Sequence, residues 1–398
     1  MTILLLTQVL PYPPDSGPQI KTWNLIKYLA RNHDVTLVSF VRGAADRQVE
    51  SLRRYCRAVH TVPLARGVAR DAGFLLASLL TRRPFMMRRD DRSAMCRVVE
   101  RVAAANAFDA VHADQLNMAP YALRVRAPLR VLDAHNALWV LYRRLAETLP
   151  LGPRRLLWAR EGRALKRYEG WCARQFDRVL AVSDADRRGL EEAMGGPADI
   201  AVMPIAVDLD ELPAIARHPG AQRIVHLGTM FWPPNVDAVQ WFADAVFPAV
   251  RAQRPDAGFD VVGARPPRAV RALAQRGGIR VTGYVADPTP YLREAGAFVV
   301  PLRAAGGMRV KILTALAQGL PVVSTSIGCE GLQTMPERDL LIADGAAAFA
   351  AATLRVLGDP GLADALGCNG RALIRSTYDY RVAYRPLDRI YPPARHAA

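Results

Sequence analysis

The sequence predicts an α/β protein with two doubly wound domains, each built on a parallel sheet. Three observations lead to this fold class. Short, apolar, β-rich segments alternate with helical patterns along the chain, as stacked βαβ units do. The alternation restarts near residue 215. The chain also has 398 residues, 51% of them hydrophobic, which is more than a single core usually holds.

The first series of elements precedes residue 205. Its first segment, Ile3–Val9, lacks a basic leader and a cleavage-site pattern, so we expect a strand rather than a signal peptide. The expected strands are Ile3–Val9, Val35–Phe40, Ala58–Leu64, Ala110–Ala113, Arg130–Ala134, Arg178–Val182 and Ile200–Met203. Amphipathic periodicity predicts helices at Ile20–Ala30, Ala94–Ala105 and Leu156–Gln175.

The second series follows the same alternation. Its expected strands are Ile224–Gly228, Phe259–Val262, Ile279–Thr282, Ala297–Pro301, Pro321–Thr325 and Leu340–Ala343. The expected helices are Val236–Arg251, Pro267–Arg276, Val310–Ala317 and Ala346–Leu357. The longest charge-free run, Ile312–Cys329, contains Gly319 and Pro321, which indicates a helix, turn and strand rather than a membrane span.

The segment Pro204–Pro213 has proline at both ends, which indicates a connector between the two series. We therefore expect an N-terminal domain over residues 1–205 and a C-terminal domain over 206–375. The tail, 376–398, is expected to form a helix that packs across both domains. Ligands of doubly wound sheets bind beyond the carboxyl ends of the strands. This rule predicts a site in a cleft between the two domains.

Net charge narrows the choice of partners only slightly. The chain carries 53 Lys and Arg against 37 Asp and Glu, a formal charge of +16, and only four of the basic residues are lysines. Most of the excess lies before residue 200. Nucleic acid, anionic lipid and phosphorylated substrates would all be attracted. The five cysteines are widely spaced without a C-x-x-C pair, which is typical of a reducing cytoplasm and disfavours a structural metal site.

Three candidate positions lie in the first half. Gly17 precedes a helix after the first strand, where a close backbone and free N–H groups favour phosphate. His112 and Asp114 share one face at the end of a strand, so they could orient or deprotonate a substrate hydroxyl. His135 and Asn136 follow the next strand, where His135 could donate to a sugar or phosphate oxygen. The alternative for Gly17 is a Pro-rich strand-to-helix loop. For His112 and Asp114 it is a solvated strand end, and for His135 it is a structural loop histidine.

The most informative segment is 300–325. A buried strand leads to paired glycines, Gly306 and Gly307, and then to a helix that begins near Arg309 and Lys311. Glycines before a helix permit backbone contact with a diphosphate, and two cations can neutralise it. Lys311 is also the only lysine after residue 166. The alternative is a glycine turn followed by two solvated cations.

These residues carry a family resemblance. Lys311–Thr325 resembles the K-x-L-E-A-M-A-x-G-x-P-V-V-x-T signature of the retaining, nucleotide-sugar-dependent glycosyltransferases of the GT-B fold, family 4. Gly328–Leu332 resembles the G-x-E-G-L that follows in that family. Weaker matches are Leu227–Asn235, Val207-Asp208, Ala181–Ser183 and Pro13–Gly17, and the resemblance covers nearly the whole chain in the right order. It implies two Rossmann-like domains facing across a cleft.

The resemblance also implies roles for residues. Gly307, Met308, Arg309 and Lys311 would hold the diphosphate of the donor, with Thr314 or Glu330 near the ribose and Gly228 in the same donor site. Gly17 would approach the donor from the other domain, while Asp114 and His112 would face the acceptor and the transferred sugar, with His135 and Asn136 nearby. No cofactor and no essential metal are expected, since protein cations and helix N-termini stabilise the leaving diphosphate.

The chain departs from the family pattern at two glutamates, whose positions are Gly306 and Thr314 here. The arginine that often follows the first strand of the second domain is also absent, since Met230 or a neighbour occupies that place. Thr314 can bond a ribose hydroxyl only more weakly than a carboxylate can. A sugar-nucleotide epimerase of the same fold, or a catalytically impaired nucleotide-sugar-binding protein, therefore stays open.

The acceptor is less defined. Gly73–Arg89 mixes apolar residues with arginines, as an interfacial element on anionic lipid would, although a packed helix followed by a basic loop is the alternative. The membrane interpretation predicts a cytoplasmic hexosyltransferase-type enzyme, peripheral on the inner face of the cell membrane. It would act on a lipid-linked or glycan acceptor in polysaccharide biosynthesis. Nucleic acid is the least favoured partner, because no recognised binding motif is present.

Overall fold

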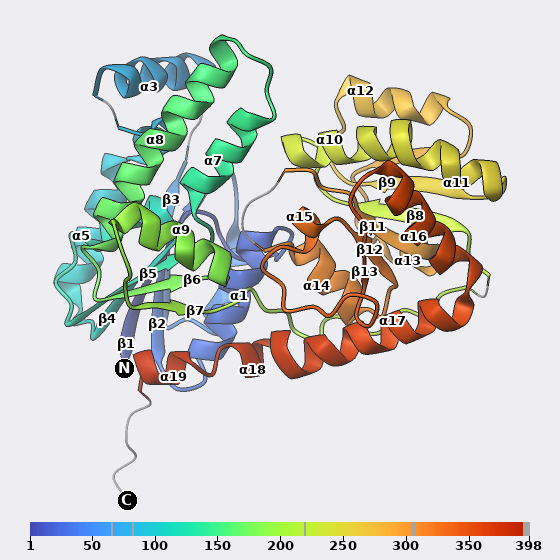
Figure 1. Ribbon diagram of the computed structural model, residues 1–398. Coiled ribbons are helices and arrows are strands. Elements are labelled where there is room, and N and C mark those ends of the chain that lie inside the picture. Colours follow the sequence, from blue (N-terminus) through green and yellow to red (C-terminus); the bar gives the residue numbers. More distant parts are fainter. Residues whose placement is uncertain (65–66, 82, 219, 305–307, 393–398) are drawn as a thin grey trace, which may run out of the picture. The chain divides into compact units, whose positions relative to one another are not determined.

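The computed structural model describes residues 1–64, 67–81, 83–218, 220–304 and 308–392 (Figure 1). The chain divides into two compact units: unit 1 comprises Met1–Ala206 and the segment from Ala383 onward, and unit 2 comprises Val207–Val382. Each unit has one parallel sheet and its own hydrophobic core. The predicted fold class, two doubly wound α/β domains, is confirmed.

Unit 1 has a seven-stranded sheet in the order β3-β2-β1-β4-β5-β6-β7. Its strands are β1 (Thr2–Thr7), β2 (Asp34–Val41), β3 (Ala58–Pro63), β4 (Ala110–Asp114), β5 (Leu129–Ala134), β6 (Arg178–Ala181) and β7 (Ile200–Val202). The strand order reverses between β1 and β4, so the carboxyl ends of these two strands form the topological switch point where doubly wound sheets bind ligands. The register sets Thr7 beside Asp114, and Asp114 beside Asp133.

The helices of unit 1 connect these strands and flank the sheet. They are α1 (Gly17–Leu29), α2 (Asp46–Arg53), α3 (Val68–Thr81), α4 (Phe85–Asp90), α5 (Ser93–Ala105), η1 (Leu116–Met118), α6 (Ala119–Ala122), α7 (Leu138–Glu147), α8 (Pro153–Ala173), α9 (Asp184–Met194) and α19 (Leu387–Ile390). Local chemistry explains their ends. In α9 the Ser183 hydroxyl accepts from the Asp186 N–H at the start, and Gly195 takes a left-handed conformation at φ +92° after the end.

Unit 2 has a six-stranded sheet in the order β10-β9-β8-β11-β12-β13. Its strands are β8 (Arg223–Leu227), β9 (Gly258–Val262), β10 (Ile279–Gly283), β11 (Ala295–Val300), β12 (Val322–Ser324) and β13 (Leu341–Ile342). Its helices are α10 (Pro233–Trp241), η2 (Phe242–Val246), α11 (Phe247–Gln253), α12 (Arg268–Arg271), η3 (Ala272–Gln275), α13 (Thr289–Arg293), α14 (Val310–Ala317), α15 (Ser326–Cys329), α16 (Ala346–Gly358), α17 (Pro360–Leu373) and η4 (Ile374–Tyr378). The short helix α18 (Tyr380–Ala383) ends at the first residue of the segment that returns to unit 1.

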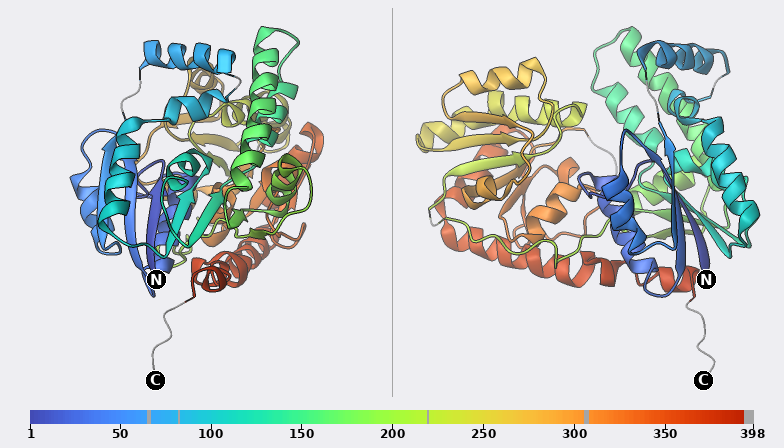
Figure 2. Two further views of the ribbon diagram at one scale, coloured as in Figure 1. Left: turned by 90° about the vertical axis from the view of Figure 1, so that its left-hand side faces the viewer. Right: turned by 180° about the vertical axis from the view of Figure 1, so that it is seen from behind.

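The last described segment returns to unit 1. Figures 1 and 2 show α19, in red, beside α1, in blue, and the Tyr28 hydroxyl on α1 donates to Asp388 on α19 at 2.9 Å. Tyr384 and Tyr391 are both fully buried there. The C-terminal segment thus forms part of the unit 1 core.

The predicted strands, the segment Gly73–Arg89 and the absence of a membrane span can each be compared with the structure. The predicted strands are all present, with ends shifted by one or two residues. In Gly73–Arg89 the basic part is only partly a loop: Arg83 lies between α3 and α4, whereas Arg88 and Arg89 belong to α4, which buries Met87 and stacks Arg89 on Phe85. Among the described residues, no helix combines the length and apolar character needed to cross a bilayer.

Candidate functional site

A buried ionic cluster lies beneath the carboxyl ends of β4 and β5 in unit 1. Lys21 on α1 forms an ion pair with Asp133 on β5, and both side chains are 0% exposed. Burial opposes the ionisation of Asp133, but the Lys21 ammonium, aided by His112 and His135, holds the pKa of that carboxyl well below its ordinary value. The cluster therefore keeps Asp133 charged, with Lys21 as its counterion.

His112 is enclosed by this cluster. Its Nδ1 lies 2.7 Å from the Tyr391 hydroxyl, and its Nε2 lies 3.6 Å from Asp133 Oδ2. Burial and the Asp133 charge raise the pKa of Tyr391 well above its ordinary value, so the phenol stays protonated and can donate to Nδ1. The Nε2 side of His112 then faces the Asp133 carboxylate.

Asp114 is paired with His135 rather than with His112. Its two oxygens accept from Thr22 Oγ1 at 2.9 Å and from His135 Nε2 at 2.8 Å. Because the carboxylate can only accept, His135 donates through Nε2, and its Nδ1 has no hydrogen-bond partner within the described part of the chain. A side chain oriented in this way presents Nδ1 to a ligand.

The polar atoms of His112, Asp114 and Asp133 lie within 4.8 Å of one another, a grouping that could ligate a cation. Several of these atoms already have partners: Lys21 pairs with Asp133 Oδ1, and both oxygens of Asp114 accept hydrogen bonds. Asp133 Oδ2 and His112 Nε2 form no hydrogen bond within the described residues. The Lys21 ammonium already supplies a positive charge beside Asp133.

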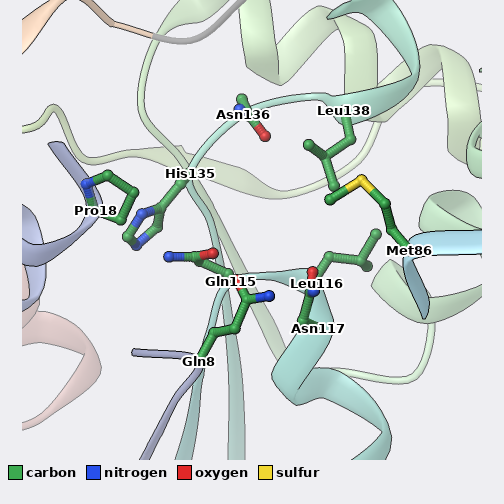
Figure 3. Close-up of a pocket in the computed structure, with 9 residues that line it drawn as sticks. All are labelled: Gln8, Pro18, Met86, Gln115, Leu116, Asn117, His135, Asn136 and Leu138. Atoms are coloured by element: carbon green, nitrogen blue, oxygen red, sulfur yellow. The ribbon is translucent and has the colours of Figure 1, made fainter. Parts of the chain in front are cut away.

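A pocket of about 90 Å³ opens beside this cluster (Figure 3). Its lining residues follow β1, β4 and β5 or lie on α1, α4 and α7: Gln8, Pro18, Met86, Gln115, Leu116, Asn117, His135, Asn136 and Leu138. Figure 3 shows Gln8, Gln115 and His135 gathered on one side, with Met86 and Leu138 on the other. The pocket therefore has an amide-rich side and an apolar side.

The candidate site of unit 2 centres on Lys311, the second residue of α14. Its Nζ lies 2.9 Å from Asn235 Oδ1 and 3.3 Å from His226 Nε2. The Nδ1 of His226 donates to the Val299 carbonyl at 2.9 Å, so its Nε2 presents a lone pair to the ammonium. Two of the three donor positions of Lys311 thus face the protein, and in the described part of the chain no carboxylate pairs with it.

Electrostatics make this lysine unusual. Burial, followed by the Arg309 guanidinium, lowers the pKa of Lys311 to about 7. Burial and Lys311 likewise lower the pKa of His226 well below its ordinary value, so this imidazole stays neutral. Gly228 leaves room for them, because a Cβ there would lie 2.7 Å from Lys311 Nζ and 2.9 Å from Asn235 Nδ2. Within the described residues, this cation at the N-terminus of α14 has no carboxylate counterion.

Two family models match most of the chain. The model described as Glycosyltransferase Family 4 matches residues 16–211, and the one described as Glycosyl transferases group 1 matches residues 221–359. The chain belongs to the GT-B glycosyltransferases. The predicted family resemblance is thereby confirmed at the level of the fold and the glycosyltransferase class.

Solved structures agree with this GT-B assignment in fold. HepE from Anabaena, in complex with UDP and glucose, is 15% identical with a TM-score of 0.68 over 98% of this chain and 99% of its own. Sucrose-phosphate synthase from Thermosynechococcus elongatus is 16% identical with a TM-score of 0.71, covering 98% of each chain. An uncharacterised 44.6 kDa protein in the cps region of Klebsiella pneumoniae is 21% identical over 97% of this chain and 98% of its own.

The predicted site residues of this glycosyltransferase fall into separate groups. In unit 1, Gly17 begins α1, His112 is enclosed, and Asp114 and His135 form a pair beside Asn136. In unit 2, Gly228 lies beside Lys311, Arg309 occupies the N-cap position of α14 without a side-chain capping hydrogen bond, and the Thr314 hydroxyl donates to the Lys311 carbonyl at 3.1 Å. Met308 is buried, Glu330 follows α15, and Gly307 lies outside the described residues.

Sequence reasoning missed several partners of these residues. Lys21, Asp133 and Tyr391 complete the cluster in unit 1, and His226 and Asn235 hold Lys311 in unit 2. One signal was available. Lysine is rare in this arginine-rich chain, and its scarcity marks Lys21 as clearly as it marks Lys311.

Proposed function

We propose that this GT-B glycosyltransferase moves a sugar from a nucleoside-diphosphate sugar to a hydroxyl acceptor, with retention at the anomeric carbon. The observation that carries the proposal is the Lys311 ammonium, which has no carboxylate partner among the described residues and stands at the N-terminus of α14. Such a place suits a diphosphate, because the ammonium and the helix N–H groups both favour negative charge.

In this proposal Lys311 and Arg309 bind the diphosphate and stabilise the charge that develops as it leaves. Met308 contributes backbone close to the phosphates, with Gly228 leaving room for them, and Thr314 or Glu330 contacts the ribose. Gly307, which the family resemblance also assigns to the phosphates, lies outside the described residues. HepE and sucrose-phosphate synthase resemble this chain in fold, and HepE is complexed with UDP and glucose. These likenesses support a nucleotide-sugar donor here.

On the acceptor side, the roles belong to unit 1. Asp114 orients His135 through the 2.8 Å hydrogen bond, so His135 Nδ1 is available to a hydroxyl of the acceptor or of the transferred sugar. Asn136 adds an amide, and Gly17 approaches the donor. His112 lies between Tyr391 and Asp133 and stabilises the buried cluster. Retention requires the acceptor hydroxyl to reach the anomeric carbon from the face that the diphosphate leaves.

The experiment that tests this proposal is a thermal-shift screen with UDP, GDP, ADP and their sugars, followed by a transfer assay. We expect one nucleotide to stabilise the protein. Lys311→Ala should abolish transfer while the variant stays folded, because the diphosphate loses its principal cation. The control Lys166→Ala removes an exposed lysine, paired with Glu192, in unit 1. Near-normal transfer by Lys311→Ala would refute the diphosphate assignment.

The same preparation separates the alternatives. An epimerase would isomerise the donor sugar without an acceptor, and an impaired binding protein would show the thermal shift without turnover. Donor isomerisation and turnover are both measured because Gly306 and Thr314 stand in place of the family glutamates.

We further propose a lipid-linked or glycan acceptor and peripheral association with anionic membranes. The support is the basic excess before residue 200. Flotation with vesicles of phosphatidylcholine, with and without phosphatidylglycerol, tests the membrane proposal. Association that does not depend on the anionic lipid would contradict it.

A further inference from the structure

Two fixed acceptors hold the Lys311 amine in unit 2. Its Nζ lies 2.9 Å from Asn235 Oδ1 and 3.3 Å from His226 Nε2. Asn235 Nδ2 donates to the Thr229 carbonyl at 2.8 Å, which turns Oδ1 toward Lys311. His226 Nδ1 donates to the Val299 carbonyl at 2.9 Å, which leaves a lone pair on Nε2. The described residues therefore offer Nζ two hydrogen-bond acceptors and no carboxylate.

Two acceptors match the neutral amine of Lys311 better than its ammonium form. An ammonium has three N–H donors, whereas a neutral amine has two N–H bonds and one lone pair. When Asn235 and His226 accept its two hydrogens, the amine directs its lone pair along the remaining tetrahedral direction. Lys311 is also partly exposed, so a small ligand can approach it.

The charges around Lys311 favour the same neutral state. Arg309, at the N-cap position of α14, is cationic, and neither Asn235 nor His226 brings a negative charge. Burial, followed by the Arg309 guanidinium, lowers the pKa of Lys311 to about 7. A lysine in water has a pKa of about 10.4. Much of Lys311 is therefore an uncharged amine near neutral pH, and such an amine bonds readily to carbonyl carbon.

An anion-binding element adjoins this amine. The helix α14 begins at Val310, directly before Lys311, and its N-cap residue makes no side-chain capping hydrogen bond. The N–H groups of its first turn and the positive end of the helix dipole both favour a phosphate. A molecule that carries an aldehyde and a phosphate would therefore meet a nucleophile and an anion-binding element side by side.

The other lysines of the chain lack this combination. Lys21 is fully buried in an ion pair, and Lys27 is only 7% exposed. Lys166 is more exposed, but its Nζ pairs with Glu192 at 2.6 Å. Among the four lysines, Lys311 alone combines partial exposure with the absence of a carboxylate partner in the described part of the chain.

We propose that Lys311 of the free protein forms an imine with aldehydes that carry a phosphate group, and that this adduct reversibly blocks the donor site. The Nζ lone pair bonds to the carbonyl carbon, the C=O π electrons move to oxygen, and a proton passes from nitrogen to oxygen. In the carbinolamine so formed, the nitrogen lone pair makes the C=N bond as the C–O bond breaks. The departing oxygen takes the last N–H proton and leaves as water.

This inference rests on the proposed function only in naming the donor site, because imine formation needs no sugar transfer. The overall change is amine plus aldehyde to imine plus water, without an oxidant or a reductant. Two sources share the required chemistry: an aromatic aldehyde phosphate of the pyridoxal type and an aliphatic aldehyde phosphate. Addition of water to the imine restores the amine, so the block is reversible.

The test treats the full-length protein with pyridoxal 5′-phosphate, reduces the imine with borohydride and locates the adduct by peptide mass spectrometry. At about pH 8, Lys311 should react roughly tenfold faster than Lys166, because far more of it is uncharged. Pyridoxal lacks the phosphate and should label Lys311 more slowly. Pyridoxine 5′-phosphate lacks the aldehyde and should give no adduct. A parallel reaction with glyceraldehyde 3-phosphate distinguishes the aliphatic source from the aromatic one.

Two variants separate imine formation from phosphate binding. Lys311→Arg keeps a cation but cannot form an imine, so it should lose the adduct and still bind the nucleotide found in the thermal-shift screen. Lys166→Ala is the matched control and should leave the labelling of Lys311 unchanged. Nucleotide added before the aldehyde should slow the labelling of Lys311 in the unaltered protein.

The outcomes distinguish this inference from the proposed function. An adduct at Lys311 with either aldehyde phosphate supports the inference and identifies the source. Equal labelling of Lys311 and Lys166, or equal rates with pyridoxal and its phosphate, would overturn it. If nucleotide binding persists in that case, the proposed transfer reaction is unaffected. Selective labelling of Lys311 in a protein that binds no nucleotide would leave imine formation standing and refute the proposed function instead.

Discussion

In the proposed donor site, Lys311 is a cation whose surroundings disfavour its charge. Its pKa is lowered to about 7 by burial and then by Arg309, so the free protein loses this proton near neutral pH. His226 stays neutral, and Asn235 carries no charge, so neither compensates the ammonium. A bound diphosphate favours the protonated form. Binding above pH 7 must therefore be accompanied by proton uptake.

We predict that nucleotide diphosphate affinity falls as pH rises from 7 to 9. The limit is about tenfold per pH unit, the value for uptake of one proton. Isothermal titration calorimetry in buffers of different ionisation enthalpy measures both the affinity and the proton uptake. Lys311→Arg, which stays charged throughout, should bind with a flat pH profile. A wild-type affinity that does not change over this range would contradict the role of Lys311.

The buried Lys21–Asp133 ion pair is a second feature at the residue scale, and it affects the stability of unit 1. Both side chains are fully buried, so removal of one leaves an uncompensated charge. We predict that Lys21→Met destabilises unit 1 by about 3–5 kcal/mol, and that Lys21→Met with Asp133→Leu recovers much of this loss. Urea unfolding followed in unit 1 measures both. Glu100→Gln, which breaks an exposed pair with Arg124, should cost no more than about 1 kcal/mol.

These residues also mark the limit of sequence-based prediction. The spacing of His112 and Asp114 correctly places both on one face of β4, but it cannot give the partner of Asp114. That partner is His135, which follows β5, because the parallel register sets Asp114 beside Asp133. Lys21 and Asp133 are separated by 112 positions, and only the assembled sheet brings them together.

At the scale of elements, the strands were predicted more completely than the partners of individual side chains. Continuous apolar runs such as β1 and β11 are buried on both faces, so their composition alone identifies them as inner strands. Helices such as α7 and α4 were not predicted. The N-terminus of α7 depends on tertiary contacts, because its N-cap residue, Ala137, has no capping side chain. Asp186 and Glu169, on two other helices, accept its N–H groups instead.

Glu169 shows how one helix caps another. Its carboxyl oxygens accept the N–H groups of Leu138 and Trp139 at 2.8 and 2.9 Å. Burial raises the pKa of Glu169 to about 8, although these two backbone donors oppose the shift. Because the folded value exceeds the ordinary value, this group's contribution to stability is complete below about pH 4.5 and is lost as pH rises through 8.

We predict that Glu169→Leu destabilises unit 1 by about 1–3 kcal/mol at pH 6, since two buried N–H groups lose their acceptor. Glu169→Gln keeps one amide oxygen and should cost less. It should also remove most of the decline in stability between pH 5 and 8. Chemical unfolding at several pH values checks both. Identical stabilities for the Leu and Gln variants would show that Glu169 does not cap α7.

At the scale of the whole molecule, unit 1 depends on residues that lie far from the rest of it in the sequence. Unit 1 is completed by residues that follow all of unit 2 in the sequence. Tyr384 donates to the Lys21 carbonyl at 3.4 Å, and its ring packs edge-on against Tyr28 at 6.0 Å. Tyr391 bonds His112. The core beneath the candidate site of unit 1 is therefore closed only when the C-terminal segment is in place.

We predict that a chain ending at Ala383 loses stability in unit 1 while unit 2 keeps its own. Two buried tyrosines contribute roughly 150–250 Å² each, worth several kcal/mol at about 25 cal/mol/Å². His112 would also lose its Tyr391 partner. Hydrogen exchange should rise in β4 and α1 and stay unchanged in β8 and β11. A chain ending at Pro392 keeps both tyrosines and should match the full-length protein. If the shorter chain protected β4 as well as this control does, the C-terminal segment would be dispensable for unit 1.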